Sequence, residues 1–387
     1  MITIQTADNA LKSFYLDAVT EALDLKANPL LAKMKRSSTS VTGKEVRKLV
    51  ACGMNGGISA GSETGNLPES ATRKRLQFVS TLKNLYGTIE ISDKALRASA
   101  NDEGAFVNLL NDEMQSLIKS ASFNFGRMLY GDGSGYLGRT NGGDENGNTT
   151  FDNINAIYEG MVIDLYGPDD SEIENGKGLV VSWVDRERGS FQCQAKGDSA
   201  FGPGLRVYAH GSKDYELTGL KAVFDDAPIY GLDRGLSSVL QPYKIESETI
   251  DENVLQTALD AIEQRSGESV NFIVCSWGVR RALINELKKN NLVMNSVELE
   301  GGFKALSFNG IPVVVDRFCP KGTMYLLNTD DFEIHQLCDW QWLEGEDGKI
   351  LKQIPGKPVY TATLVKYAEL MCAKPFGQGM ISGIQEA

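Results

Sequence analysis

The segment NDEGAFVNLLNDEMQSLIKSASFNFGRMLYGDGSG, residues 101–135, predicts one long amphipathic helix that ends abruptly in glycine. Its apolar residues recur at steps of three and four, the spacing of one helix face. These residues are Phe106, Leu109, Leu110, Met114, Leu117, Ile118, Ala121, Phe125, Met128 and Leu129. Asn101 and Asp102 can cap the start, and Gly131, Gly133 and Gly135 can end the helix, because glycine readily adopts the left-handed conformation. About 28 helical residues span roughly 42 Å, a length that suits a brace across a wide, flat subunit.

The residues before this helix predict strands that are joined by a long polar connection. Strand-forming residues fill 45–51, 75–81 and 85–92. The connection between the first two strands is rich in Gly, Ser, Asn and Thr. Isolated two-stranded ribbons are marginal in water, and structureless loops beyond about 15 residues are uncommon in compact domains. We therefore expect the ribbon to pack on another copy of the chain; an ordinary surface loop is the alternative.

Length and composition indicate a globular protein of several units. A chain of 387 residues holds two or three units of ordinary domain size. It is 42% hydrophobic and 23% charged, as globular proteins are. The net charge of -12 argues against a dedicated nucleic-acid reader. One segment, 33–48, is basic and predicts either a solvated face or a contact with an acidic neighbour subunit or a packaged polyanion.

The cysteines and the hydropathy exclude several classes of protein. Six cysteines, at 52, 193, 275, 319, 338 and 372, form no Cys-x-x-Cys pair, so neither a zinc site nor a redox motif is indicated. Their pattern is typical of a chain made in a reducing cytosol. No apolar run approaches about 18 residues, so no membrane span is predicted. The N-terminus is polar and predicts a helix over 8–25, not a signal peptide.

The remainder of the chain predicts a β-rich insertion followed by mixed structure. Residues 139–153 are a polar connector, and 157–225 predict a small barrel or sandwich. Its strands are expected near 157–165, 179–184, 190–194, 205–208 and 217–223. Beyond residue 250 the pattern predicts helices at 254–263 and 277–289, and strands at 271–275, 311–315, 323–327, 332–337 and 359–367. This irregular alternation is typical of an α+β domain.

Several segments, in this order, resemble the major capsid protein of a tailed bacteriophage with the HK97-type fold. LKNLYGTIEISDKAL (82–96) leads into the long helix as the extended loop leads into the spine helix of that family. FNFGRMLYGDGSG (123–135) is similar to the segment that ends the spine helix. Three segments resemble the axial domain: NFIVCSWGVRRAL (271–283), FKALSFNGIPVVVD (303–316) and GTMYLLNTDDFEIHQ (322–336). YTATLVKYAELMCAKPFGQGMISGI (360–384) resembles the closing strand of the peripheral domain.

The resemblance implies an α+β, HK97-like capsid fold with a small inserted β domain. The divisions it implies are an N-terminal arm (1–40), an extended loop (41–92), a peripheral domain with the spine helix (93–138), a connector with the inserted domain (139–245), an axial domain (246–350) and a return segment (351–387). The inserted domain is not part of the minimal fold of the family.

The implied function is self-assembly into hexamers and pentamers of an icosahedral head that encloses double-stranded DNA. The protein would be part of the virion, made in the bacterial host cytoplasm, and not an enzyme. Its partners would be copies of itself, with scaffolding, portal and decoration proteins, and DNA bound only weakly and non-specifically. Scaffold would be a separate protein or a processed N-terminal segment. Two alternatives are an encapsulin-like nanocompartment shell and a soluble α+β enzyme.

No residue is assigned as catalytic, cofactor-binding or metal-binding, and no cofactor is expected. Residues 133–138 spell G-x-G-x-x-G, but they follow a helix, whereas a dinucleotide site lies between a strand and a helix, so a turn is predicted. Asp144, Asn146 and Asn148 have the spacing of three calcium ligands. Thr149 and Asn155 stand where such a loop needs glycine and glutamate.

The remaining polar candidates have structural interpretations. His210 and His335 lack a partner at a spacing that suggests a triad, and His335 is expected to be a satisfied structural histidine. Asp330, Asp331 and 344–347 predict solvated turns, and Trp340 and Trp342 predict core or interface packing. Some members of the resembled family crosslink subunits by a lysine–asparagine bond. Nothing marks any lysine near the loop as reactive, so no crosslink is predicted; these lysines are Lys44, Lys48, Lys74 and Lys83.

Overall fold

The computed structural model describes residues 28–95, 103–144, 147–194, 201–289, 295–299, 303–345 and 348–387. Within these, only the backbone is considered for 103–112, 295–299 and 303–305. The expected helix at 8–25, the caps Asn101 and Asp102, and Asn146 lie outside the described residues.

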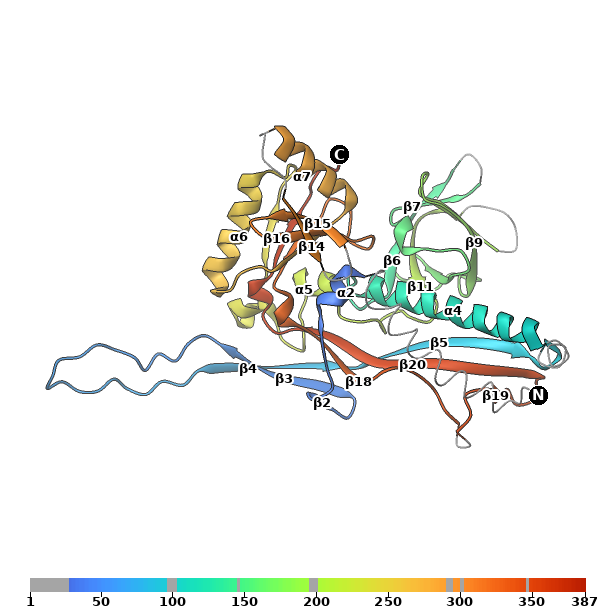
Figure 1. The fold of residues 1–387 in the computed structure, drawn as a ribbon, viewed down its shortest axis with the longest axis horizontal. Helices are drawn as coiled ribbons and strands as arrows, with labels where there is room; N and C mark the ends of the chain where they lie inside the picture. Colours follow the sequence, from blue (N-terminus) through green and yellow to red (C-terminus); the bar gives the residue numbers. More distant parts are fainter. Residues whose placement is uncertain are drawn as a thin grey trace.

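A long, narrow sheet and one long helix form the base of the molecule (Figure 1). β20 (Val359–Cys372) pairs antiparallel with β5 (Lys83–Ser92) and β18 (Phe332–Trp342). β1 (Lys35–Ser37) runs parallel to β18, and the short β19 (Lys352–Gln353) pairs with β20.

The predicted long helix is confirmed as α4 (Glu103–Met128), which lies along β5. Met114, Ile118 and Phe125 are buried at the predicted spacing. Gly87 on β5 allows the close approach, because a Cβ there would lie 2.9 Å from Leu117 Cδ1. The helix ends before the predicted glycines: Gly131 N donates to Met128 O at 3.0 Å in a tight last turn, and the left-handed Gly133 (φ +90°) lies in the turn that follows.

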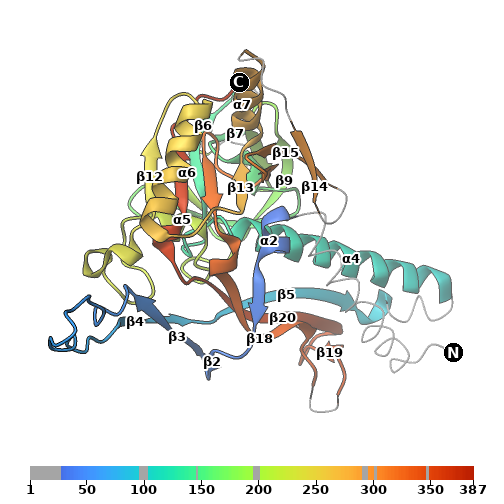
Figure 2. The same cartoon turned by 60° about the vertical axis from the view of Figure 1, so that its left-hand side comes forward.

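The predicted ribbon is a hairpin that projects away from this base (Figures 1 and 2). β3 (Glu45–Cys52) and β4 (Lys74–Thr81) pair antiparallel over their whole length. β2 (Val41–Thr42) extends the pair at its inner end, whereas 53–73 contain no strand. The ribbon therefore does not fold back onto its own core.

The expected α+β unit is present as a seven-stranded sheet with two helices. The strand order is β12 (Tyr243–Glu246), β21 (Gly379–Ser382), β17 (Met324–Leu327), β13 (Phe272–Cys275), β16 (Ile311–Val315), β15 (Phe303–Phe308) and β14 (Asn295–Leu299). α6 (Glu252–Ser266) is capped by the Asp251 carboxylate, which accepts from Val254 N at 2.8 Å. Gly267, with a φ of +68°, ends it. α7 (Trp277–Lys289) has the predicted bounds.

The predicted small β unit is a closed, six-stranded barrel, but its boundaries differ from the expected ones. Its order is β10 (Ser190–Cys193), β7 (Thr149–Phe151), β6 (Tyr136–Gly143), β11 (Pro203–Ala209), β8 (Val162–Tyr166) and β9 (Leu179–Asp185). The expected connector at 139–153 is therefore wrong, because it contains most of β6 and all of β7. Glycine and asparagine, which are rare in strands, made β6 read as a loop; Gly142 even has a φ of +102°.

Of the other expected barrel strands, the one at 157–165 begins too early and the one at 217–223 is wrong. Residues 157–161 form a turn after η1 (Ile154–Ala156), and the strand begins only at Val162. The run at 217–223 leads into the helix α5 (Leu220–Phe224), whose apolar residues join the core beneath the hairpin. A short run that is apolar on every side does not distinguish a buried strand from a buried helix.

Short helical turns complete the chain. They are α2 (Pro29–Lys33), η2 (Arg234–Leu236), η3 (Ser238–Leu240), η4 (Thr329–Asp331) and η5 (Pro375–Gly377). α2 packs against α4 through Asn28, whose Nδ2 donates to Ser122 O at 3.2 Å. Gly126 leaves the space that Asn28 occupies, since a Cβ there would clash with the Asn28 amide.

Candidate assembly surfaces

The outer part of the hairpin carries large apolar side chains that contact almost nothing. Met54, Ile58 and Leu67 are 93%, 88% and 90% exposed. Burying such a side chain is worth about 1.5–3 kcal/mol, and exposed apolar clusters mark interaction sites. Glu63 and Glu69 are the charged residues between 53 and 72, and both are exposed. We call residues 53–72 the hairpin tip; it is apolar and acidic.

The root of the hairpin is held firmly by the body. Val46 and Phe78 are fully buried, and the Phe78 ring stacks on Tyr230 at 5.2 Å between centroids. Val79 N donates to Tyr230 O at 3.1 Å. Lys48 Nζ lies 2.6 Å from Glu333 Oε2 on β18. A fixed root and an uncovered tip are what a docking element requires.

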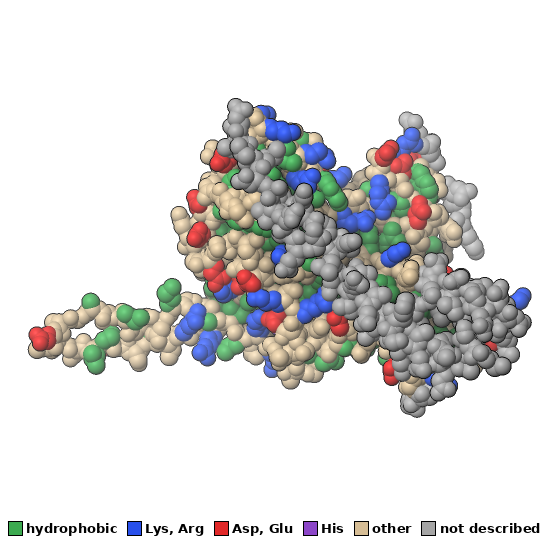
Figure 3. Space-filling view, in the orientation of Figure 1, with side chains coloured by type: hydrophobic (Ala, Val, Ile, Leu, Met, Phe, Trp, Pro, Cys, Tyr) green, Lys and Arg blue, Asp and Glu red, His purple; other side chains and the backbone are tan. Residues whose placement is uncertain are grey.

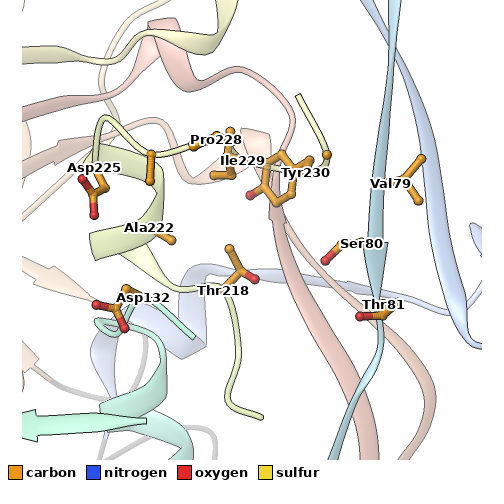
Figure 4. A pocket seen from close by; sticks show the side chains of 12 residues that line it. Val79, Ser80, Thr81, Asp132, Thr218, Ala222, Asp225, Pro228, Ile229 and Tyr230 are labelled. Atoms are coloured by element: carbon orange, nitrogen blue, oxygen red, sulfur yellow. The ribbon is translucent and has the colours of Figure 1, made fainter. Parts of the chain in front are cut away.

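A polar cavity of about 380 Å³ lies beside this root (Figure 4). Ser80 and Thr81 of β4 line one side, and Thr218, Asp225 and Tyr230 lie around it. Among the described residues, no group of three His, Cys, Asp or Glu side chains could hold a metal ion here or elsewhere.

Next to the cavity, Glu369 of β20 is fully buried. Its carboxylate accepts from Ser80 Oγ at 3.3 Å, Thr218 N at 2.8 Å and Leu370 N at 2.9 Å. Burial raises the pKa of Glu369 to about 7, although these donors favour the ionised form. The root of the hairpin therefore contains a carboxyl group that titrates near neutral pH.

The stem of the hairpin is basic. Arg73, Lys74 and Arg75 are consecutive and exposed, and within the described part of the chain none forms an ion pair. Of the other lysines singled out from the sequence, Lys44 is exposed, Lys48 is paired with Glu333, and the charge of Lys83 acts on buried Glu369. The absence of a crosslink stays a prediction.

A second apolar surface lies on the face of the β5–β20–β18 sheet that is turned away from α4. Gly87 faces α4, so its neighbour Tyr86 faces outward, next to Val365 and Tyr367 of β20. Tyr86, Leu337 and Leu343 are large apolar side chains that remain exposed on this sheet. A cavity of about 590 Å³ adjoins them, lined by Trp342, Ile350 and Val365 among others.

Comparison with known proteins identifies the fold. No family model matches the sequence, and no curated relative does. Among solved structures, the cyanophage A-1(L) capsid asymmetric unit matches with a TM-score of 0.57 at 10% identity, over 93% of each chain. The chain has the HK97-type capsid fold. Two other structures have lower scores. The capsid of a native GTA particle has a TM-score of 0.49 at 12% identity, over 93% of this chain and 92% of that chain. The holo-SrpI encapsulin complex from Synechococcus elongatus PCC 7942 has a TM-score of 0.46 at 11% identity, over 96% of this chain and 95% of that chain.

Two ion pairs with buried cations join segments that are distant in the sequence, and sequence reasoning did not find them. Arg127 near the end of α4 makes two hydrogen bonds to Glu216, at 2.8 and 2.5 Å, and both side chains are almost fully buried. Lys366 Nζ lies 2.5 Å from Asp339 Oδ1 and 5.4 Å from the centre of the Phe125 ring. These partners are 89 and 27 residues apart, so no local pattern could reveal them.

The histidines lie apart and differ from the expectation. His210 Nδ1 lies 2.7 Å from Asp164 Oδ1, a pairing that spacing did not suggest. Burial opposes ionisation of Asp164, but hydrogen bonds from His210, Gly178 and Gly211 outweigh it and lower its pKa. His335 is buried as expected, yet neither ring nitrogen has a hydrogen-bond partner among the described residues. Burial lowers its pKa, so the ring is held neutral.

The remaining candidates are turns or core residues. Residues 133–135 form a turn, as predicted, whereas 136–138 are the first residues of β6. Asp144 Oδ1 and Oδ2 accept from Asn148 N and Nδ2, both at 2.8 Å, which closes a turn.

The predicted exposure of the acidic pair is right for Asp330 and wrong for Asp331. Asp331, the last residue of η4, is buried, and burial raises its pKa to about 6; Asp330 is exposed and pairs with Lys35. Of 344–347, the last two residues lie outside the described ranges. Trp340 and Trp342 are buried, as predicted.

Proposed function

We propose that this protein is the repeating subunit of an icosahedral phage head, which self-assembles into hexamers and pentamers around double-stranded DNA. The observation that supports this most directly is the hairpin. Its tip exposes three apolar side chains that cannot reach the core of their own chain. The cyanophage A-1(L) capsid asymmetric unit contains a chain of the same fold, and in a shell of copies a neighbouring subunit would cover such a tip.

The contacts would be heterologous, since a projecting tip meets a different surface on the next copy. Heterologous contacts generate rings when the rotation closes. The basic stem, the apolar sheet face and α4 are the other surfaces that we assign to contacts between copies. In this proposal 1–40 is the arm, 41–92 the extended loop and 246–350 the axial domain. The inserted domain is the barrel from Tyr136 to Ala209.

The role is structural, and we assign no catalytic residue. Scaffolding, portal and decoration proteins are the further partners we propose, and the subunit would be made in the host cytoplasm. The net charge of -12 supports weak, non-specific contact with DNA. None of the described helices is long and apolar enough to cross a membrane.

Expression of the full chain in a bacterial host tests this function. Size-exclusion chromatography and negative-stain microscopy should show closed shells, or rings that become shells when a scaffold is supplied. A discrete small particle under all these conditions would refute the shell function and favour the soluble enzyme. Shells that enclose a protein cargo, and never DNA in infected cells, would favour the nanocompartment.

A further inference from the structure

Two arginines and three aromatic rings meet where the barrel, α4 and the seven-stranded sheet adjoin. The ring of Phe123 on α4 lies edge-on to Tyr158 at 4.8 Å and to Phe318 at 4.9 Å between centroids. The guanidinium of Arg317 lies over Phe123 at 4.8 Å and over Phe318 at 5.3 Å. Arg186, from the β9–β10 turn, donates from Nη2 to Ile157 O at 3.1 Å, directly before Tyr158. We call these five side chains the arginine–aromatic cluster.

The two positive charges of this cluster have no carboxylate within ion-pair distance among the described residues, although the charge of Asp316 favours the ionised form of Arg317. Neither Arg186 nor Arg317 forms an ion pair with any residue that the structure describes. Asp316 precedes Arg317, but it is buried, and its carboxylate accepts from Phe318 N at 3.0 Å. The charge of Arg186 also acts unfavourably on Arg317. Two arginines that repel each other beside half-exposed rings form a site that an anion with apolar neighbours would stabilise.

The arginine–aromatic cluster is accessible to solvent. In Figure 3, Lys and Arg side chains gather in the depression between the two upper lobes. Arg186 is exposed, and Arg317 and the three rings are partly exposed. The Arg317 guanidinium lies within cation–π distance of two rings, and a guanidinium can bind a carboxylate through two parallel hydrogen bonds.

The hairpin tip has the complementary composition. Glu63 and Glu69 are its charged side chains, and neither forms an ion pair within the described residues. Met54, Ile58 and Leu67 accompany them and are almost fully exposed. The tip therefore carries free carboxylates with apolar neighbours, whereas the cluster carries free guanidinium groups with aromatic neighbours.

The tip cannot reach the cluster of its own chain. The hairpin extends from one end of the long axis, whereas the barrel stands at the other (Figure 1). We propose that the arginine–aromatic cluster receives the hairpin tip of a second copy of this chain, with a tip carboxylate bound by Arg186 and Arg317 and the apolar tip side chains against the rings. This inference rests on the proposed shell function and names the receiving site on the neighbouring subunit.

A charge exchange between the two surfaces tests the proposal. The variants are Glu63→Arg with Glu69→Arg on the tip, and Arg186→Glu on the cluster, each made in the full chain. All three residues are exposed, so circular dichroism of the unassembled protein should be unchanged. Either variant alone should raise the protein concentration needed for shells by on the order of tenfold. The combined variant should restore most of the wild-type value, because the charges are again complementary.

Matched controls lie on the same barrel. Glu174→Arg reverses an exposed acidic residue away from the tip, and Arg188→Glu reverses an arginine in the same turn as Arg186. Both should assemble as the wild type does.

Three results would overturn the proposal while leaving the shell function intact. In the first, the tip variant and the Arg186 variant assemble as the wild type does. In the second, the combined variant does not recover the wild-type assembly concentration. In the third, Arg186→Glu forms normal shells whose only defect is that they no longer contain DNA. Failure of the wild-type chain to form any shell would instead reject the function itself.

Discussion

Replacing Glu216 with alanine should destabilise the subunit strongly, because it leaves the Arg127 guanidinium buried without a counter-charge. The side chains of Arg127 and Glu216 are only 8% and 3% exposed. Two charge-assisted hydrogen bonds, at 2.8 and 2.5 Å, join them. Breaking a buried pair from one side costs about 3–5 kcal/mol, more than the pair contributes relative to apolar residues of similar size. We expect the free energy of unfolding of the core around α4 to fall by this amount.

Denaturant unfolding of the unassembled subunit measures the effect. The ring centres of buried Trp340 and of Phe125 on α4 lie 6.4 Å apart, so the fluorescence of Trp340 reports on this core. The matched control is Arg127→Met combined with Glu216→Leu, which removes both charges and keeps apolar volume. It should recover most of the lost stability, since neither partner is left unpaired. A loss below about 1 kcal/mol for Glu216→Ala, the range of exposed pairs, would refute the assignment of a buried, bridging ion pair.

Three further predictions concern the hairpin tip, the buried carboxyl group at its root and the close contact of Gly219 with the end of α4. Replacing the three exposed apolar tip residues with serine should leave the melting temperature of the unassembled subunit within about 1 °C of wild type, because exposed positions contribute little to stability. The same change should reduce shell formation, measured by light scattering. Unchanged assembly would count against the tip as a docking element. Between pH 4.5 and about 7, Glu369 keeps its proton in the folded subunit and loses it in the unfolded chain, because its pKa is raised from 4.5 to about 7 on folding. The free energy of unfolding therefore falls as pH rises through that window, by up to about 3 kcal/mol. Urea midpoints from pH 5 to 8 should fall less steeply in Glu369→Gln, and parallel slopes would contradict this assignment. Gly219→Ala should destabilise by about 1–3 kcal/mol, since its Cβ would lie 2.4 Å from Met128 O and 2.6 Å from Leu129 O; Gly202→Ala, with open space around it, is the control for the same thermal melt.

The sequence predicted those elements whose pattern is complete within one segment. α4, α7 and β16 have periodic or continuous apolar residues and clear ends, and α7 and β16 have the expected bounds. β6 was missed because glycine and asparagine, which are rare in strands, fill half of it, and its partner strands β7 and β11 cannot be recognised from its own sequence. α5 was predicted as a strand because its five residues are too few to show a helical period.

Of the two candidate docking surfaces, the sequence predicted one and not the other. The hairpin was predictable, since a glycine-rich connection between two strands has no core of its own. The arginine–aromatic cluster was not, because it combines residues from α4, the barrel and the end of β16. Residues 123, 186 and 317 become neighbours only through the fold, and no spacing along the chain encodes that arrangement.

The hairpin has a fixed root and a compliant tip, and this combination bears on how one chain can build a curved, closed surface. Buried Phe78 and the Lys48–Glu333 pair fix the direction in which the hairpin leaves the body. Beyond Cys52 the strands stop, and Gly56, Gly57, Gly61 and Gly65 follow within the tip. In the proposed shell, hexamers and pentamers would place neighbouring subunits at different angles, so a contact used in both would have to accommodate a change in angle. A rigid root preserves which neighbour is reached, while a glycine-rich tip can adjust to the neighbour's orientation. The length and glycine content of the tip are therefore better explained by variable geometry between copies than by the folding of a single subunit.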